Sequence, residues 1–305
     1  MNYKVLDHIE ENTFKSNFLE TENWALLKQE EGWKSFFIHF YINDKLIGYT
    51  LLLEKKTNIF KLHYIPRGPI IEEEYFKEAL DLIISFSKKE GAFLLTIEPS
   101  LEYSDTRIKY LEKFKESSVS YQPKETAIIN LEEDIIKNIP SKKRGRIRNK
   151  HNLIFRETDD LENFYKLYKN TFENNNFKGR SLNYFHNMKK CFKEDMLIFE
   201  VLHENTVISS SVNIVHQDSI TYLYSGSLKE FNNLYPGYLL VYETAKYAQS
   251  IGLKSFDLWG VSYDNPSWKG FSEFKFNMGG RYFKFLGNFD YSFNNLLYFV
   301  YKKLK

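Results

Sequence analysis

The hydrophobic and polar residues of this chain alternate with two periodicities, one typical of helices and one of strands. The same order of helical and strand-like segments occurs twice. In the first half, helical spacing over residues 12–30 and 72–89 predicts two helices, and Gly91 is a natural C-cap for the second. Runs typical of β-strands lie at 35–42, 46–54, 59–65 and 93–98. The predicted order is helix, three strands, helix and a buried strand with Glu98 near its end.

The second half has a similar order of elements. Two amphipathic helices, each with an N-cap residue, are predicted over 159–174 and 181–193. Strand-like runs follow at 196–203, 207–216 and 220–225, and a helix from about 237 to 250 ends at Gly252. A last buried strand, 255–259, carries Asp257 at the place that Glu98 has in the first half.

An antiparallel meander, a helix and a parallel return strand form the layout of an N-acetyltransferase-like (GNAT) domain. The repeat therefore predicts an α/β fold of two tandem GNAT-like domains separated by a cleft, which suits a chain of 305 residues. We expect the first domain at 1–138, with a C-terminal helix at 291–305 packing back on it. The second is expected at 139–290, beginning with a basic helix at 141–151.

Composition narrows the class of protein. With 43% hydrophobic and 17% aromatic residues, the chain can bury well-packed cores. The single cysteine, Cys191, excludes an internal disulfide and a cysteine-based metal site, and the seven histidines lack metal-ligand spacing. The N-terminus is polar and acidic, unlike a signal peptide, and no apolar run approaches the ~20 residues that span a bilayer. These features predict a cytoplasmic protein without a metal site.

The net charge of +2 does not show that basic residues are concentrated in one segment. The join between the halves, SKKRGRIRNK at 141–150, contains no acid, and its bases are Lys142, Lys143, Arg144, Arg146, Arg148 and Lys150. A solvated linker helix is one interpretation. We favour a surface that binds the phosphates of a nucleic acid, because crowded like charges are unfavourable unless a partner offsets them.

The turns that precede the two central helices indicate whether the protein can use acyl-CoA as its acyl donor. A domain that binds acyl-CoA needs a glycine-rich turn whose backbone N–H groups hold the pyrophosphate at the helix N-terminus. The corresponding segments, RGPIIEE at 67–73 and NNLYPG at 232–237, lack the Q/R-x-x-G-x-G/A pattern, and Pro236 removes one donor. A donor other than acetyl-CoA is therefore predicted.

A glycine-punctuated segment, GFSEFKFNMGG at 270–280, follows the last buried strand and places Lys275 between Phe274 and Phe276. Such a lysine either extends its charge to solvent along apolar neighbours or holds a cation in a partly dry site. In the second case it can stabilise the oxyanion that forms when an amine attacks an ester.

Several segments, spread over nearly the whole chain, resemble the FemABX peptidyltransferases, which use aminoacyl-tRNA to build peptidoglycan side chains. Besides the basic join, they are FLETENWALLK at 18–28, YIPRGP at 64–69, TIEP at 96–99, RSLNYF at 180–185, YLYSGS at 222–227, FDLWG at 256–260 and FK at 274–275. Their order and spacing together carry the resemblance. The chain lacks the coiled-coil arm of the staphylococcal members and is more similar to the compact members that act on soluble UDP-MurNAc-pentapeptide.

The resemblance implies roles for individual residues. Lys275 would stabilise the tetrahedral intermediate and the leaving ribose hydroxyl, Phe274 would shape this catalytic site, and Tyr224 would lie near the acceptor amine. Lys28 and Arg180 match cations that hold the precursor's diphosphate, a ligand that suits both side chains. Taken alone, Lys28 is equally well interpreted as a surface lysine.

Further substrate contacts are implied at Tyr184, Tyr222, Glu98, Arg67 and Asp257. Tyr184 is expected on a helix, and core packing is its alternative. Glu98 stands where the family often has an acid, and Arg67 is expected at the mouth of the first domain's cleft. For Asp257 the alternative is a structural bond to the loop that follows it.

These implications predict a tRNA-dependent aminoacyltransferase. Its acceptor is the side-chain amine of the stem peptide, in UDP-MurNAc-pentapeptide or a lipid-linked form. Aminoacyl-tRNA is the co-substrate, with no cofactor, no metal, no DNA and at most a peripheral membrane contact. The rivals are a GNAT-type transferase that uses acyl-CoA, a tRNA-dependent transferase that modifies protein N-termini, and a tRNA-binding protein without activity.

Overall fold

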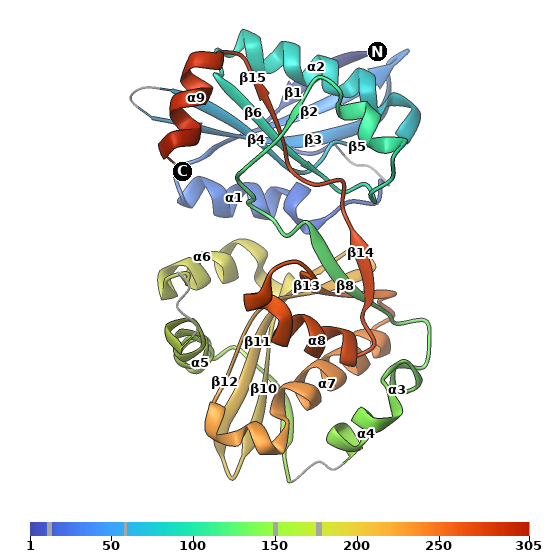
Figure 1. Ribbon diagram of the computed structural model, residues 1–305, viewed down its shortest axis with the longest axis vertical. Coiled ribbons are helices and arrows are strands. Elements are labelled where there is room, and N and C mark those ends of the chain that lie inside the picture. The colour runs from blue at the N-terminus through green and yellow to red at the C-terminus, as the bar shows by residue number, and fades with distance from the viewer. Residues whose placement is uncertain (11–13, 58–59, 149–151, 175–178, 305) are drawn as a thin grey trace. The chain divides into compact units, whose positions relative to one another are not determined.

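The computed structural model describes the chain except residues 11–13, 58–59, 149–151, 175–178 and 305, and it forms two compact units (Figure 1). Unit 1 contains Met1–Lys124 and Lys284–Lys305, and unit 2 contains Glu125–Phe283. These divisions differ from the predicted 138/139 and 290/291. The reason is strand pairing, because β8 (Glu125–Asn130) pairs with β13 of unit 2 and β15 (Phe289–Ser292) pairs with β6 of unit 1.

The sheet of unit 1 has the order β1-β2-β3-β4-β6-β15-β7, with β5 paired to β3. Its other strands are β1 (Asn2–Leu6), β2 (Lys34–Ile42), β3 (Lys45–Lys56), β4 (Lys61–Arg67), β5 (Ile70–Ile71), β6 (Leu94–Pro99) and β7 (Lys115–Glu116). The predicted meander and parallel return strand are present as β2-β3-β4 and β6. The pairing of β4 with β6 continues to the last residues of both strands, Arg67 and Pro99.

Helices α2 (Phe76–Lys89) and α1 (Glu22–Glu30) cover opposite faces of this sheet (Figure 1). The alternation of side chains along β2 explains this, because Ile38 and Phe40 join the core that includes α2, whereas Phe37 is buried on the other face. The helix predicted over 12–30 is shorter. It begins at Glu22 because Thr21 caps it, accepting a hydrogen bond from the backbone N–H of Trp24.

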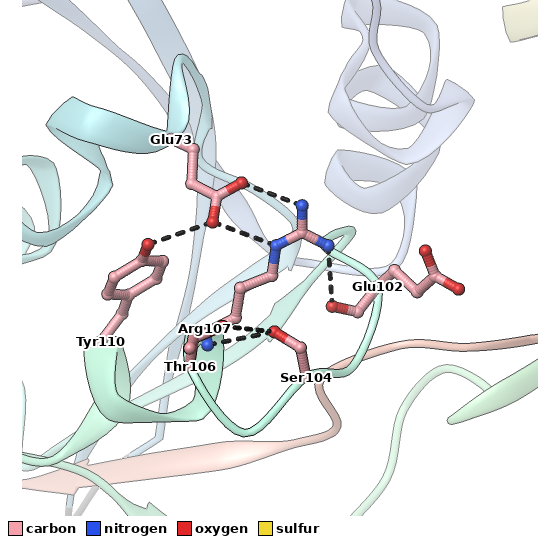
Figure 2. A network of polar contacts seen from close by, with 6 residues as sticks. All are labelled: Glu73, Glu102, Ser104, Thr106, Arg107 and Tyr110. Atoms are coloured by element: carbon pink, nitrogen blue, oxygen red, sulfur yellow. Dashed lines mark hydrogen bonds and ion pairs between the residues drawn. The ribbon is translucent and has the colours of Figure 1, made fainter.

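An ion-pair network fixes the segment that follows β6 (Figure 2). Arg107, in the short 3-10 helix Arg107–Leu111, donates to both carboxylate oxygens of Glu73 at 3.1 and 2.9 Å. The hydroxyl of Tyr110 donates to the same carboxylate, and Arg107 also donates to the carbonyl oxygen of Glu102. Glu73 begins the 3-10 turn before α2, so the network ties this segment to the helix that covers the core.

The sheet of unit 2 has the order β14-β8-β13-β12-β11-β10-β9. Its other strands are β9 (Ile154–Thr158), β10 (Met196–His203), β11 (Thr206–His216), β12 (Ser219–Ser227), β13 (Ser255–Gly260) and β14 (Arg281–Lys284). Helix α7 (Pro236–Ser250) packs on one face together with α3 (Ile135–Asn138) and α4 (Ser141–Arg148). On the other face lie α5 (Leu161–Asn174) and α6 (Leu182–Phe192) (Figure 1).

The central parallel pair differs between the units. In unit 2, β12 and β13 pair only as far as Thr221 and Asp257, although β12 continues to Ser227 and β13 to Gly260. On its other side β13 pairs with β8 from Ser255 to Gly260, with a register shift after Asp257. The two parallel strands of unit 2 therefore part, whereas those of unit 1 do not.

Gly226 provides a test of the packing of α5 on β12. A Cβ atom at this position would meet the backbone carbonyl carbon and oxygen of Leu167 at 2.3 and 2.4 Å. We expect Gly226→Ala to destabilise the protein by about 1–3 kcal/mol, because the backbone of α5 must shift. The measurement is the free energy of unfolding.

Gly145 is the matched control, since it lies within α4 and an added Cβ would meet open space. Gly145→Ala is expected to stabilise the protein by about 0.5–1 kcal/mol, because alanine loses less backbone freedom on folding. Equal unfolding free energies for both variants would contradict the described packing.

Candidate active site

Lys275 lies on α8 (Lys269–Asn277), and its ammonium is bound to the end of β13. The Nζ atom donates to the carbonyl oxygens of Gly260 at 2.7 Å and Trp259 at 3.2 Å. Burial lowers the pKa of Lys275 to about 8, and the nearby charge of Asp257 opposes this shift. Lys275 is therefore a cation at neutral pH that loses its charge more readily than an ordinary lysine.

The strand end that Lys275 contacts has a strained backbone. Trp259 has a φ of +63°, a region that residues with a Cβ rarely adopt. Asp257 supports this conformation, because its Oδ1 accepts from the backbone N–H of Trp259 at 2.7 Å and from the hydroxyl of Thr126. The bond to the following residues, which was the structural alternative for Asp257, is thus present.

Phe274 points from the same helix to a different neighbour. Its ring meets that of Tyr238 edge to face, with centroids 5.1 Å apart, at the first turn of α7. Gly237 lies beside the same ring, since a Cβ there would be in ordinary van der Waals contact with Phe274 at 3.7 Å. Phe274 thus joins α8 to the N-terminus of α7, while Lys275 joins it to β13.

Arg146 of α4 reaches the same end of α7. Its guanidinium lies over the rings of Tyr235 and Tyr238, at 4.6 and 4.9 Å, and Nη1 donates to the Tyr238 hydroxyl at 2.7 Å. The motif YPGY at 235–238 was a signal for this contact that sequence reasoning missed. A cation thus lies beside a helix N-terminus, an arrangement that attracts anions.

The other basic residues of the join differ in their surroundings. Arg144 donates to the carbonyl oxygens of Ile139 and Lys137, so this arginine serves the local structure, which corrects the expectation that every base faces a ligand. Lys142 and Arg148 are exposed and Lys143 is half-buried. Lys150 lies outside the described residues.

Three of the predicted residues meet on the other face of unit 2. The guanidinium of Arg180 lies 4.7 Å from the ring centre of Tyr184, and the hydroxyls of Tyr184 and Tyr224 are 3.2 Å apart. Phe185 packs edge to face against Tyr224. Tyr168 of α5, which sequence reasoning missed, accepts from the backbone N–H of Arg180 through its hydroxyl. The result is a tyrosine cluster that carries one cation.

Tyr222 does not belong to this cluster, which corrects the prediction. Neighbouring residues of β11, Val212 and Asn213, pair with Tyr224 and Tyr222 respectively, so a bulge at Leu223 turns the two tyrosines to opposite faces. Tyr222 is buried in the core beside Phe256, and burial raises its pKa to about 12. A buried core position contradicts a substrate contact for Tyr222.

In unit 1, Lys28 is buried rather than on the surface. Its Nζ lies 2.6 Å from the carboxylate of Glu31 and 4.6 Å from the ring centre of Trp24. The interpretation of Lys28 as an ordinary surface lysine is therefore wrong. The ion pair neutralises its charge in part, so an anionic ligand would share the ammonium with Glu31.

Glu98 and Arg67 are also buried in unit 1. The carboxylate of Glu98 accepts from the hydroxyl of Tyr64 and from the backbone N–H groups of Tyr121 and Gln122, and burial raises its pKa. Arg67 is only 1% exposed, and it donates to a carbonyl oxygen at 2.7 Å, that of Pro123. These contacts correct the expectation that Arg67 lies at the mouth of a cleft and leave Glu98 as an internal brace.

Comparison with known proteins identifies the fold on which these clusters lie. The chain matches the FemAB family over residues 3–129, 115–202 and 197–305. The chain belongs to the FemAB family. It is 24% identical to a lipid II:glycine glycyltransferase of Staphylococcus haemolyticus, over 95% of this chain and 91% of the relative. It is 22% identical to a UDP-N-acetylmuramoylpentapeptide-lysine N(6)-alanyltransferase of Weissella viridescens, over 80% of each.

Solved structures with a similar fold agree with this match. A crystal structure of FemX covers 94% of this chain with a TM-score of 0.84 and 21% identity, over 95% of that chain. A tandem GNAT protein from clavulanic acid biosynthesis covers 85% with a TM-score of 0.52 and 10% identity, over 82% of that chain. The predicted fold of two GNAT-like domains is thereby confirmed. In the described part of this FemAB protein, no helix is long and apolar enough to span a bilayer, and no group of three metal-ligating side chains occurs.

The pKa of Lys275 in this FemAB protein can be measured by competitive labelling with acetic anhydride, which acylates only the neutral amine. We expect half-maximal labelling of Lys275 near pH 8, whereas an ordinary lysine has a pKa of about 10.4. Asp257→Asn should move the midpoint lower, because the charge that favours the ammonium is removed. Labelling of Lys275 with an ordinary midpoint would contradict the described burial.

Proposed function

We propose that this chain transfers an amino acid from aminoacyl-tRNA to the side-chain amine of the stem peptide of a peptidoglycan precursor. Membership of the FemAB family supports this, as do the names of two relatives, a glycyltransferase and an alanyltransferase. One name specifies lipid II and the other UDP-N-acetylmuramoylpentapeptide. The acceptor class is therefore a muropeptide, soluble or lipid-linked, and the cytoplasm, where charged tRNA occurs, is the place of reaction.

The observation that carries the proposal is the ammonium of Lys275. An ammonium has three N–H donors, and among the described residues two of them serve the carbonyl oxygens of Trp259 and Gly260. The third donor makes no hydrogen bond within the described residues, where Nζ also lies 5.3 Å from the ring centre of Phe271, and we propose that a ligand takes this donor. Because these two bonds fix the direction of the ammonium, a donor is already oriented before substrate arrives.

The chemistry needs one such donor and no cofactor. The amine of the acceptor attacks the ester carbon of aminoacyl-tRNA, an N–C bond forms, and the carbonyl oxygen becomes negatively charged. Lys275 stabilises this oxygen, then the C–O bond to the ribose breaks and the ribose oxygen takes a proton. With a pKa of about 8, Lys275 can supply that proton and recover one from the new amide nitrogen.

The parting of β12 from β13 supports unit 2 as the donor side. The strands separate after Thr221 and Asp257, and Lys275 is bound to β13 beyond that point. Arg146 and the first turn of α7 present positive charge to phosphate. The exposed bases Lys142 and Arg148 extend this charge along α4, which suits an RNA backbone.

We also propose which residues contact the acceptor substrate. In unit 2, Arg180 is the proposed phosphate ligand, because stacking on Tyr184 fixes its guanidinium plane. Tyr224 is the proposed contact near the acceptor amine, since its hydroxyl already meets that of Tyr184. In unit 1, Lys28 is the proposed second phosphate ligand.

A transfer assay tests the reaction. We expect charged tRNA and UDP-MurNAc-pentapeptide to give a product whose mass increases by one or more aminoacyl residues. RNase should abolish the transfer. Activity that survives RNase and follows added acyl-CoA, or that accepts peptides without the UDP-sugar, would refute the proposal.

Variants of Lys275 separate its catalytic role from a structural one. We expect Lys275→Ala to lower kcat by ~10²–10³, the usual effect of removing one oxyanion donor. In the wild type, activity should fall as pH rises through about 8, because the ammonium is deprotonated there. In Lys275→Arg, whose charge persists, this alkaline fall should disappear. An unchanged alkaline fall in Lys275→Arg would show that Lys275 only supports the fold.

The proposed RNA surface is tested by the salt dependence of tRNA affinity. Lys142→Gln with Arg148→Gln should weaken binding and lower the slope of log K against log salt by about one for each phosphate that the variant no longer binds. Arg144→Gln is the control, because Arg144 bonds to backbone carbonyls. Equal slopes in the wild type and the double variant would exclude α4 as the RNA surface.

A further inference from the structure

Helix α9 (Asn295–Leu304) has apolar side chains on two faces. Its inner face contributes Tyr298 and Tyr301, which are buried in unit 1. Its outer face contributes Leu296, Phe299 and Val300, which are 74%, 57% and 46% exposed. These three follow helical spacing, so they form one continuous strip that nothing in the described part of unit 1 covers.

The inner face holds α9 in this orientation. The hydroxyl of Tyr298 donates to the carboxylate of Asp290 at 3.0 Å, and the ring of Tyr301 packs on Phe93 with centroids 5.6 Å apart. Asn294 caps the helix, because its side-chain oxygen accepts from the backbone N–H groups two and three residues later, at 3.1 and 3.0 Å. The helix therefore cannot rotate to bury its outer strip, and α9 itself lies at one side of the sheet of unit 1 (Figure 1).

The charges on α9 are all positive. Lys303 extends back over the ring of Phe299 with Nζ 4.4 Å from its centre, and Lys302 lies similarly over Tyr298. From residue 291 to the end of the chain the sequence has three lysines and no acid. An apolar strip that ends in lysines, with no acid beside them in the sequence, is the pattern of a helix that lies in a membrane interface.

We propose that the outer face of α9 docks on the surface of a bilayer that contains anionic lipids. Leu296, Phe299 and Val300 enter the boundary between headgroups and acyl chains, while Lys302 and Lys303 contact anionic headgroups. The helix has 10 residues and is about 15 Å long, so it lies along the surface and does not cross the bilayer. A second copy fits less well, because its α9 offers no acid to these lysines.

This inference does not rest on the proposed function, since docking needs neither tRNA nor acceptor. The experiment is sedimentation of the full chain with vesicles of phosphatidylcholine alone or mixed with phosphatidylglycerol. We expect binding to the mixed vesicles that is weakened by salt and is at least ~10-fold weaker on phosphatidylcholine alone, because each lysine near an anionic surface contributes to affinity.

Variants assign the binding to α9. Leu296→Ser with Phe299→Ser and Val300→Ser should abolish sedimentation, and Lys302→Gln with Lys303→Gln should remove the preference for phosphatidylglycerol. The matched control is Ile154→Ser with Ile251→Ser, which alters apolar residues of unit 2 that are 58% and 50% exposed. The control should bind as the wild type does. Thermal unfolding identifies any variant that fails to fold, and the single change Phe299→Ser then replaces the triple variant.

Three results would overturn the proposal. The first is that the wild type does not sediment with mixed vesicles. The second is that the control binds as weakly as the α9 variants. The third is that the wild type is a dimer that the triple variant converts to a monomer, because the outer strip would then be covered by a second copy of this chain.

Discussion

A buried ammonium needs partners, and the end of β13 is shaped to provide them. Lys275 bonds to two consecutive carbonyl oxygens, of Trp259 and Gly260, at the point where Trp259 adopts a positive φ. Asp257 in turn fixes the N–H of Trp259. The same strand end is where β13 leaves β12, so the cation, the strained backbone and the parting of the strands are parts of one arrangement. A rigid, partly dry cation is suited to stabilise the oxyanion of the amide formation that we propose.

The two units show how a repeated architecture can diverge. Glu98 and Asp257 occupy equivalent places, and each carboxylate braces the segment beside its return strand. In unit 1 the parallel strands stay paired to their ends, and Arg67 is buried there. In unit 2 they separate, and Lys275 bonds to the end of β13 beyond the point of separation. The equivalent acid therefore makes structural hydrogen bonds in both units, and the units differ in the pairing of their parallel strands.

The elements that could be predicted from the sequence are those in which hydrophobic and polar residues alternate strongly. Elements without such a pattern were missed. The meanders, α2, α6 and α7 follow from periodicity, since one face of each is buried. Strand β8 was not predicted, because its run of strand-forming residues is short. Helix α8 was not predicted either, because glycines near both of its ends interrupt the helical pattern. The bulge at Leu223 could not be foreseen, because it depends on register with β11, and it decides which tyrosine joins Arg180. The burial of Arg67 depends on a contact with Pro123, which is distant in the sequence, and the use of Arg144 as a local donor depends on how the chain turns between α3 and α4.

The discontinuity of unit 1 has a consequence for synthesis on the ribosome. Strand β15 lies between β6 and β7, and it is translated after all the strands of unit 2. Until it emerges, the edge of β6 has no partner there, and Asp290 is missing from its bond with Thr96. Unit 2 is encoded within the interruption, so all its strands exist before unit 1 can close. Unit 2 can thus complete its sheet before unit 1 does, and the sheet of unit 1 is finished by a segment that is translated after unit 2.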